Sequence, residues 1–133
     1  MYRKKVLIFA DHYLPGFKAG GPIRSIQSLC DGLKNSFDIY LVTRNHDHGS
    51  VDTYANIIFE EWTSVNGIKV MYCDSRRFNM VKIYNIMCNV RPDIIQLNSL
   101  MSLKFTFFPL LISFFSNFKK CMTWIKENVK DEV

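Results

Sequence analysis

Polar side chains that could contact a ligand follow three separate apolar segments of this sequence. The first segment is followed by Asp11-His12, the second by Thr43-Arg44-Asn45-His46-Asp47, and the third by Asn98-Ser99. If the three segments are parallel strands of one sheet, their carboxyl ends lie along the same edge, where such sheets bind ligands. Any one of these polar loops is ordinary. Their shared position predicts a site built from His12, Arg44, Asp47, Asn98 and Ser99.

A glycine-rich loop follows the first polar cluster. It runs from Gly16 to Arg24 and contains the adjacent pair Gly20-Gly21, followed directly by Pro22. Glycines allow close backbone approach, and proline is favoured in the first turn of a helix. The predicted first turn has no Asp or Glu, so its unpaired N–H groups and the helix dipole could accept a phosphate. A turn that only connects strand and helix is the alternative, and the loop matches neither a dinucleotide fingerprint nor a Walker loop.

Strands and helices are expected to alternate along the chain. Continuous apolar runs predict strands at 6–10, 37–43, 68–73 and 93–98, with 57–59 as a candidate edge strand in an ambiguous stretch, 50–66. Helical spacing predicts helices at 22–33, 78–90 and 103–118. The expected buried stripe of the first helix is Ile23, Ile26, Leu29, Cys30 and Leu33, and that of the second is Met80, Val81, Tyr84, Met87 and Cys88.

This alternation predicts the fold class α/β, a doubly wound parallel sheet of the Rossmann-like type. The expected spatial order of the four strands is third, second, first, fourth. That order places a topological switch point between the first and fourth strands, next to the polar clusters.

Composition fits one globular domain. The chain has 133 residues, of which 48% are hydrophobic and 22% are charged, and its net charge is +5. The basic residues are scattered, which argues against nucleic acid as a partner and favours an anionic ligand or an anionic membrane surface. Four separated cysteines indicate core thiols, and the short apolar run after the basic amino terminus does not fit a signal peptide, so we expect a cytoplasmic protein.

Several motifs together resemble the amino-terminal domain of family 4 glycosyltransferases, retaining enzymes of the GT-B architecture. They are Lys5-Val6-Leu7-Ile8-Phe9, His12-Tyr13-Leu14-Pro15, Gly20-Gly21-Pro22-Ile23-Arg24-Ser25-Ile26, Asp38-Ile39-Tyr40-Leu41-Val42-Thr43 and Pro92-Asp93-Ile94-Ile95-Gln96-Leu97-Asn98-Ser99. The bacterial branch that builds lipopolysaccharide, capsule and other surface polysaccharides is the most similar. The resemblance covers residues 4–112, and the double-glycine segment is its most specific part.

The resemblance implies roles for the candidate residues. Gly20, Gly21 and Arg24 would lie beside the donor diphosphate, and His12, Arg44, Asp47, Asn98 and Ser99 would line the acceptor side of the cleft. Many members of the family carry a histidine just after the fourth strand, where this chain has Asn98-Ser99, so no catalytic residue is assigned. The nucleotide sugar would be a co-substrate, the acceptor a glycan or a lipid-linked glycan, and neither a cofactor nor a metal is expected.

Length departs from the family pattern. The resemblance implies a second domain that holds the nucleotide, and no such segment is present in the 133 residues. We therefore expect an incomplete amino-terminal domain at 1–118 and an atypical charged tail at 119–133, as in a truncated or split reading frame. A separately encoded carboxy-terminal half is the implied partner, and the chain alone should not transfer sugar.

Two other functions are compatible with the sequence. The first is a non-catalytic subunit that binds a sugar phosphate at the same edge of the sheet. The second is a membrane-associated protein that lies peripherally on the inner face of the plasma membrane. It is suggested by the segment 105–115, which is strongly apolar and lies between Lys104 and Lys119-Lys120. That segment is shorter than the ~20 residues of a spanning helix, so a buried helix is preferred. His46-x-His48 lacks a third ligand at a defined spacing and does not predict a metal site.

Overall fold

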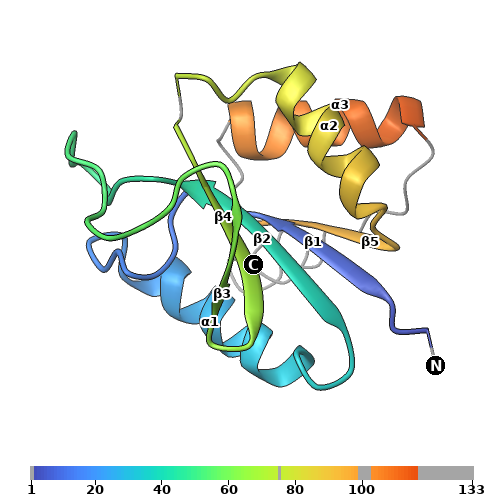
Figure 1. Ribbon diagram of the computed structural model, residues 1–133, viewed down its shortest axis with the longest axis horizontal. Coiled ribbons are helices and arrows are strands. Elements are labelled where there is room, and N and C mark those ends of the chain that lie inside the picture. The colour runs from blue at the N-terminus through green and yellow to red at the C-terminus, as the bar shows by residue number, and fades with distance from the viewer. Residues whose placement is uncertain (1, 75, 99–102, 117–133) are drawn as a thin grey trace, which may run out of the picture.

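A five-stranded sheet with helices on both faces organises the computed structural model, which describes residues 2–74, 76–98 and 103–116 (Figure 1). Its strands are β1 (Lys5–Phe9), β2 (Asp38–Arg44), β3 (Trp62–Val65), β4 (Ile68–Cys73) and β5 (Ile94–Leu97), and its helices are α1 (Gly21–Leu33), α2 (Met80–Val90), the π-helix η1 (Leu103–Phe107) and α3 (Phe108–Ser116). The predicted α/β class is therefore confirmed, and the arrangement is compatible with a Rossmann-like fold. The tail at 119–133 and residues 117–118 of the third predicted helix lie outside the described residues.

The order of the strands is β3-β4-β2-β1-β5. Strands β4, β2, β1 and β5 are parallel, in the predicted order, and their carboxyl ends share one edge of the sheet. The chain reverses direction across the sheet between β1 and β5, which is the predicted switch point.

Strand β3 was not predicted. It pairs antiparallel with β4 and is joined to it by Asn66-Gly67, both of which have positive φ angles of 49° and 84°. Such angles are typical of a two-residue hairpin turn, and Asn-Gly is a strong sequence signal for it. The candidate edge strand at 57–59 is wrong as a strand, because only Phe59 pairs there, through one isolated bridge to Tyr72.

The apolar strands are buried because both faces of the sheet are covered. In β1, Leu7 and Phe9 pack under α2 and α3, while Val6 and Ile8 pack against α1. Alternate side chains of one strand thus belong to two different cores, which explains why the strand has no polar residue after Lys5.

The buried face of α1 agrees with the predicted stripe at Ile23, Ile26 and Cys30. The predicted face of α2 was wrong. Its buried residues are Ile83, Ile86, Met87 and Val90, whereas Met80, Val81, Tyr84 and Cys88 are exposed and only Met87 was placed correctly. The predicted and the buried residues both recur at helical spacing. The buried residues pack against Phe78, Phe105 and Ile112.

The apolar segment that begins at Phe105 contributes to the core. Phe105 is fully buried and stacks on Phe78 with 4.6 Å between ring centroids, and Ile112 is also buried. This agrees with the preferred prediction of a buried helix. Among residues 2–74, 76–98 and 103–116, no helix is both long and apolar enough to cross a membrane.

Candidate functional site

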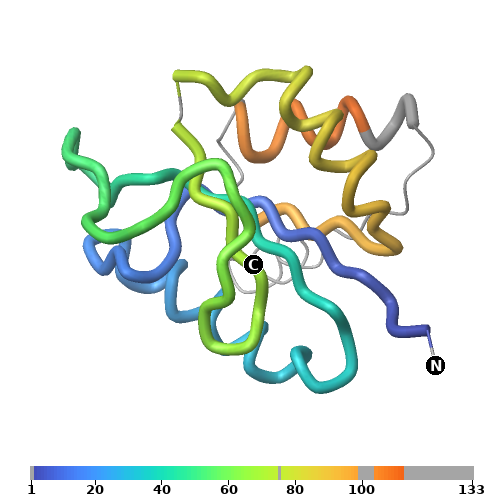
Figure 2. The backbone as a smooth tube through the Cα atoms, viewed as in Figure 1, coloured from blue at the N-terminus to red at the C-terminus, as the bar shows by residue number. Residues whose placement is uncertain are grey.

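Two loops at the carboxyl edge of the sheet lie side by side: residues 11–20 after β1 and residues 45–58 after β2 (Figure 2). The Asp47 carboxylate joins them. It accepts hydrogen bonds from the backbone N–H of Phe17 at 3.1 Å, of Lys18 at 3.2 and 3.3 Å, and of His48 at 2.8 Å. Asp47 is only 8% exposed. Its carboxylate therefore positions the glycine-rich loop and is occupied by backbone donors.

These contacts determine the charge of Asp47. Burial alone would raise its pKa, but the hydrogen bonds from Phe17, His48 and Lys18 outweigh burial and lower the pKa below the ordinary carboxyl value. The side chain is consequently ionised at neutral pH, which strengthens each of the bonds that it accepts.

Tyrosines from β4 and from the second loop support the loop after β1. The hydroxyl of Tyr72 donates to the Leu14 carbonyl at 2.5 Å, and that of Tyr54 donates to the Tyr13 carbonyl at 3.5 Å. The rings of Tyr54 and Tyr72 meet edge to face, 5.9 Å apart. Burial raises the pKa of Tyr72 to about 12, so its hydroxyl remains protonated and able to donate. The Leu14–Pro15 peptide bond of this loop is cis.

Gly16 lies at the centre of this packing. A Cβ atom at that position would lie 2.3 Å from the Tyr54 hydroxyl, 2.9 Å from Asp47 Oδ1 and 3.0 Å from the Tyr13 carbonyl oxygen. A side chain there would force Tyr54 and Asp47 to shift, so the close approach favours glycine. Sequence reasoning missed Gly16, Tyr54 and Tyr72. A glycine next to proline was the available signal for the first, and nothing in the pattern singled out the two tyrosines.

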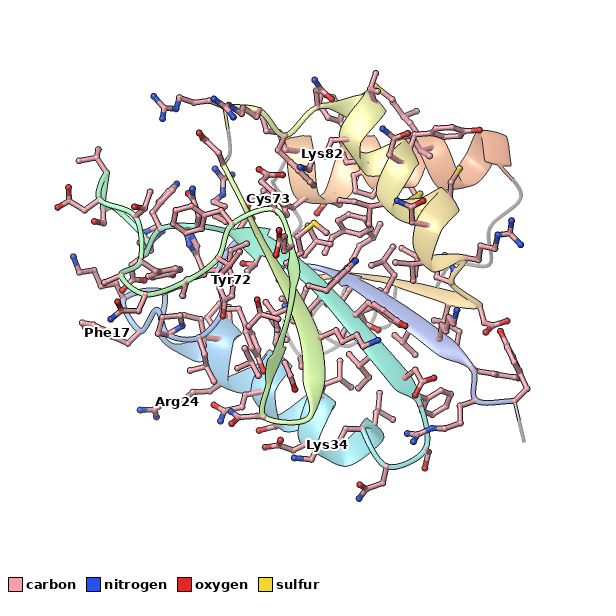
Figure 3. All side chains as sticks on the ribbon, viewed as in Figure 1. Phe17, Arg24, Lys34, Tyr72, Cys73 and Lys82 are labelled. Atoms are coloured by element: carbon pink, nitrogen blue, oxygen red, sulfur yellow. The ribbon has the colours of Figure 1, made fainter. Side chains whose placement is uncertain are left out.

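The loop delivers Gly20 and Gly21 to the amino terminus of α1, as predicted. Gly20 is the N-cap residue, with φ of 68°, and neither a side-chain cap nor an acidic residue is present in the first turn. A Cβ atom on either glycine would meet nothing within 4 Å. Arg24 is exposed, and Figure 3 shows it and Phe17 projecting outward on the same side of the molecule. The amino terminus of α1 is therefore open to a ligand and has no carboxylate of its own.

Arg44 is held by neighbours on the α2 and α3 face of the sheet. Its Nη2 and Nε atoms donate to Asp11 Oδ1 at 3.0 and 3.2 Å, and its guanidinium lies 5.1 Å from the centroid of the Phe105 ring. The side chains of Arg44 and Asp11 remain 25% and 22% exposed. Arg44 thus keeps a rigid orientation at the edge of the sheet, with part of its charge neutralised by Asp11.

His12 lies in a group of histidines between the two loops. Its ring contacts those of His46 and His48, with centroid separations of 6.1 and 5.3 Å, and its Nδ1 atom lies 3.4 Å from the His46 carbonyl oxygen. Burial lowers the pKa of His12 below its ordinary value, against the opposing effects of the His46 carbonyl and Asp11. His12 is therefore mainly neutral at neutral pH. Within the described ranges, no three His, Cys, Asp or Glu side chains are arranged to hold a metal ion.

Buried polar atoms mark the same edge of the sheet. Asn98 is 5% exposed and Thr43 is fully buried, and neither Asn98 Nδ2 nor Thr43 Oγ1 has a hydrogen-bond partner among the described residues. The Asn98 backbone N–H bonds to the Phe9 carbonyl at 3.2 Å, which places Asn98 beside the end of β1. Ser99, the last predicted site residue, lies outside the described residues.

The edge therefore combines an open helix amino terminus, a neutral histidine, an oriented arginine and a buried amide. These groups could bind an anionic or hydroxyl-rich molecule through hydrogen bonds. Comparison of the chain with protein-family models, with curated proteins and with solved structures found no match.

Proposed function

We propose that this chain is the acceptor-side domain of a sugar-transferring enzyme, in which the open amino terminus of α1 faces the diphosphate of a nucleotide-sugar donor. The observation that carries the proposal is the pair Gly20-Gly21. The Gly20 N–H donates to the Phe17 carbonyl at 3.0 Å, which leaves the N–H groups of Gly21 and Ile23 to face a ligand. The first turn has no Asp or Glu, and a Cβ atom on either glycine would meet nothing within 4 Å. A diphosphate needs such donors, and the positive end of the helix dipole adds to the attraction.

The sequence motifs support this reading beyond the bare presence of a helix terminus. Gly20-Gly21-Pro22-Ile23-Arg24 resembles the donor-side segment of family 4 glycosyltransferases, and it follows β1, one of the two strands at the switch point. A second, nucleotide-binding domain would supply the other side of the cleft. The parent enzyme would act in the biosynthesis of a bacterial surface polysaccharide.

The roles proposed on the acceptor side depend on which polar atoms already make hydrogen bonds within the chain. Asp47 would act by positioning the loop, since backbone donors occupy its carboxylate. His12 and the Asn98 Nδ2 atom, which has no hydrogen-bond partner among the described residues, would contact acceptor hydroxyls. Arg44 would present the exposed part of its guanidinium. Arg24, on the exposed first turn of α1, would approach the phosphates.

Binding of inorganic pyrophosphate to the full chain, followed by the chemical shifts of backbone amides, tests the proposal. Pyrophosphate should shift the amides of Gly21 and Ile23 in a saturable way. Gly21→Asp should weaken binding at least tenfold, because it adds a carboxylate at the helix start, where that charge favours the fold but repels the ligand. Gly21→Ala is the matched control and should bind nearly as well, since a Cβ there meets no atom within 4 Å.

The results that would refute the proposal are specific. Pyrophosphate shifts scattered over surface lysines, with none at residues 20–24, would exclude this helix terminus as the phosphate site. Equal binding by Gly21→Asp and Gly21→Ala would do the same.

A further inference from the structure

An exposed apolar stripe runs along α2, next to its buried face. Met80, Val81 and Tyr84 are 38%, 67% and 50% exposed, and Cys88 is also exposed. Eight large apolar side chains are exposed among the described residues, and three of them lie within positions 80–84. Such clustering indicates a contact surface, whereas single exposed apolar residues are ordinary.

Basic residues flank this stripe at both ends. Arg76 and Arg77 precede α2 and Arg91 follows it, and the sequence from 76 to 92 contains no Asp or Glu. Nearby carboxylates have partners of their own: Asp74 pairs with Arg76, and Glu60 pairs with Lys82. Asp93, two residues after Arg91, accepts hydrogen bonds from the Tyr2 hydroxyl and the Lys5 N–H. No ion pair involves Arg77 or Arg91 among the described residues, and both are exposed. The surface is therefore apolar along its length and positive at its ends.

We infer that the α2 stripe, Met80, Val81, Tyr84 and Cys88 with Arg77 and Arg91 at its ends, is a docking surface for an anionic lipid bilayer. A helix that lies flat on a membrane inserts apolar side chains among the acyl chains and places arginines beside lipid phosphates. A tyrosine suits the boundary, because its ring is apolar and its hydroxyl polar. Asn85 and Asn89 are exposed beside the stripe and would remain at the level of the headgroups.

The charge distribution disfavours the main alternative, a second copy of the chain. Two α2 helices packed antiparallel through this stripe would bring Arg77 of each copy toward Arg91 of the other, and like charges repel. A bilayer with anionic headgroups meets both ends of the stripe with opposite charge. The inference does not depend on the proposed function. It also concerns a surface distinct from the apolar segment that starts at Phe105, because Phe105 and Ile112 are buried.

Flotation of the full chain with vesicles tests the inference. The chain should bind vesicles of phosphatidylcholine mixed with phosphatidylglycerol and should bind vesicles of phosphatidylcholine alone at least tenfold more weakly. The double variant Val81→Ser/Tyr84→Ser should bind the mixed vesicles at least tenfold more weakly than the unsubstituted chain. Val51→Ser/Ile58→Ser is the matched control, since both residues are exposed, at 95% and 60%, on a loop away from α2.

Charge is tested separately with Arg77→Gln/Arg91→Asn, in which asparagine suits the left-handed backbone at position 91, where φ is 53°. Each arginine should contribute about fivefold to binding of the mixed vesicles. Thermal unfolding must be unchanged in all variants, as expected for exposed positions. Three outcomes would overturn the inference: no vesicle binding by the unsubstituted chain, equal losses in the α2 and loop variants, or self-association that the α2 variants abolish.

Discussion

Replacing Asp47 should destabilise the fold more than replacing any other carboxylate on the same loop. Its carboxylate accepts bonds from three backbone N–H groups, those of Phe17, Lys18 and His48. A hydrogen bond to a charged group contributes about 1.5–3 kcal/mol, and water can replace part of that where the donors lie near the surface. We therefore expect Asp47→Ala to lower the free energy of unfolding by ~2–4 kcal/mol. Asp47→Asn keeps one neutral acceptor and should cost ~1–2 kcal/mol.

Urea and thermal unfolding of the full chain measure this effect. For a domain of this size, 1 kcal/mol corresponds to a shift of about 3–5 °C in Tm, so Asp47→Ala should melt roughly 10 °C lower. Asp52→Asn is the matched control. Asp52 is exposed on the same loop, and among the described residues its carboxylate has no hydrogen-bond donor, while its backbone N–H donates to Ser50 Oγ.

The pH dependence gives an independent check. Because the folded pKa of Asp47 is depressed, its contribution is fully present above the ordinary carboxyl pKa of 3.8 and disappears as the pH falls through the lower, folded value. The difference in stability between the unsubstituted chain and Asp47→Asn should be constant from pH 5 to 7 and should shrink below about pH 4. A difference that is absent at pH 7, or equal to that of Asp52→Asn, would refute the assignment of Asp47 as the residue that joins the two loops.

Two further substitutions test the packing of the same edge. Gly16→Ala should destabilise the chain by ~1–3 kcal/mol, because its Cβ would overlap the Tyr54 hydroxyl, and adding Tyr54→Phe should recover part of the loss in urea unfolding. Gly32→Ala, at a position where a Cβ meets nothing within 4 Å, is the control, and equal midpoints for the two alanine variants would contradict the clash. Thr43→Val should leave the free energy of unfolding unchanged or raise it by ~1 kcal/mol, because it removes a buried hydroxyl that has no partner among the described residues. A clear loss of stability in Thr43→Val would mean that the hydroxyl has a partner in the folded chain.

The order of the parallel strands could be predicted because burial on both faces leaves a strong trace in the sequence. Runs such as Val6–Ala10 and Ile68–Cys73 have few polar residues, and Gly20-Gly21 and Arg91-Pro92 mark the ends of helices. The strand Trp62–Val65 has no such trace, because it lies at the edge of the sheet and is only partly buried. The turn residues Asn66-Gly67 were its one clear signal.

The face of α2 could not be read from its pattern. Apolar residues cover more than half of the circumference of this helix, so two stripes at helical spacing compete, one through Tyr84 and one through Ile83 and Ile86. Which stripe is buried depends on the apolar surface that the sheet and α3 present to the helix. That surface is set by the fold and not by the eleven residues of the helix. Apart from Met87, the residues that the pattern predicts to be buried are therefore the ones that form the exposed stripe proposed to contact a lipid surface.

The role of Asp47 was equally beyond the sequence. A carboxylate after a strand can serve a ligand or the backbone, and its partners here, Phe17 and Lys18, lie about thirty positions earlier in the chain. Since this one side chain fixes the loop that ends at Gly20, the position of the helix terminus depends on the loop after β2 as well as on the loop after β1. A substitution at Asp47 should therefore weaken pyrophosphate binding without removing any group that touches the ligand. Gly21→Asp should weaken binding without loss of stability, so the two substitutions separate positioning from contact at the same site.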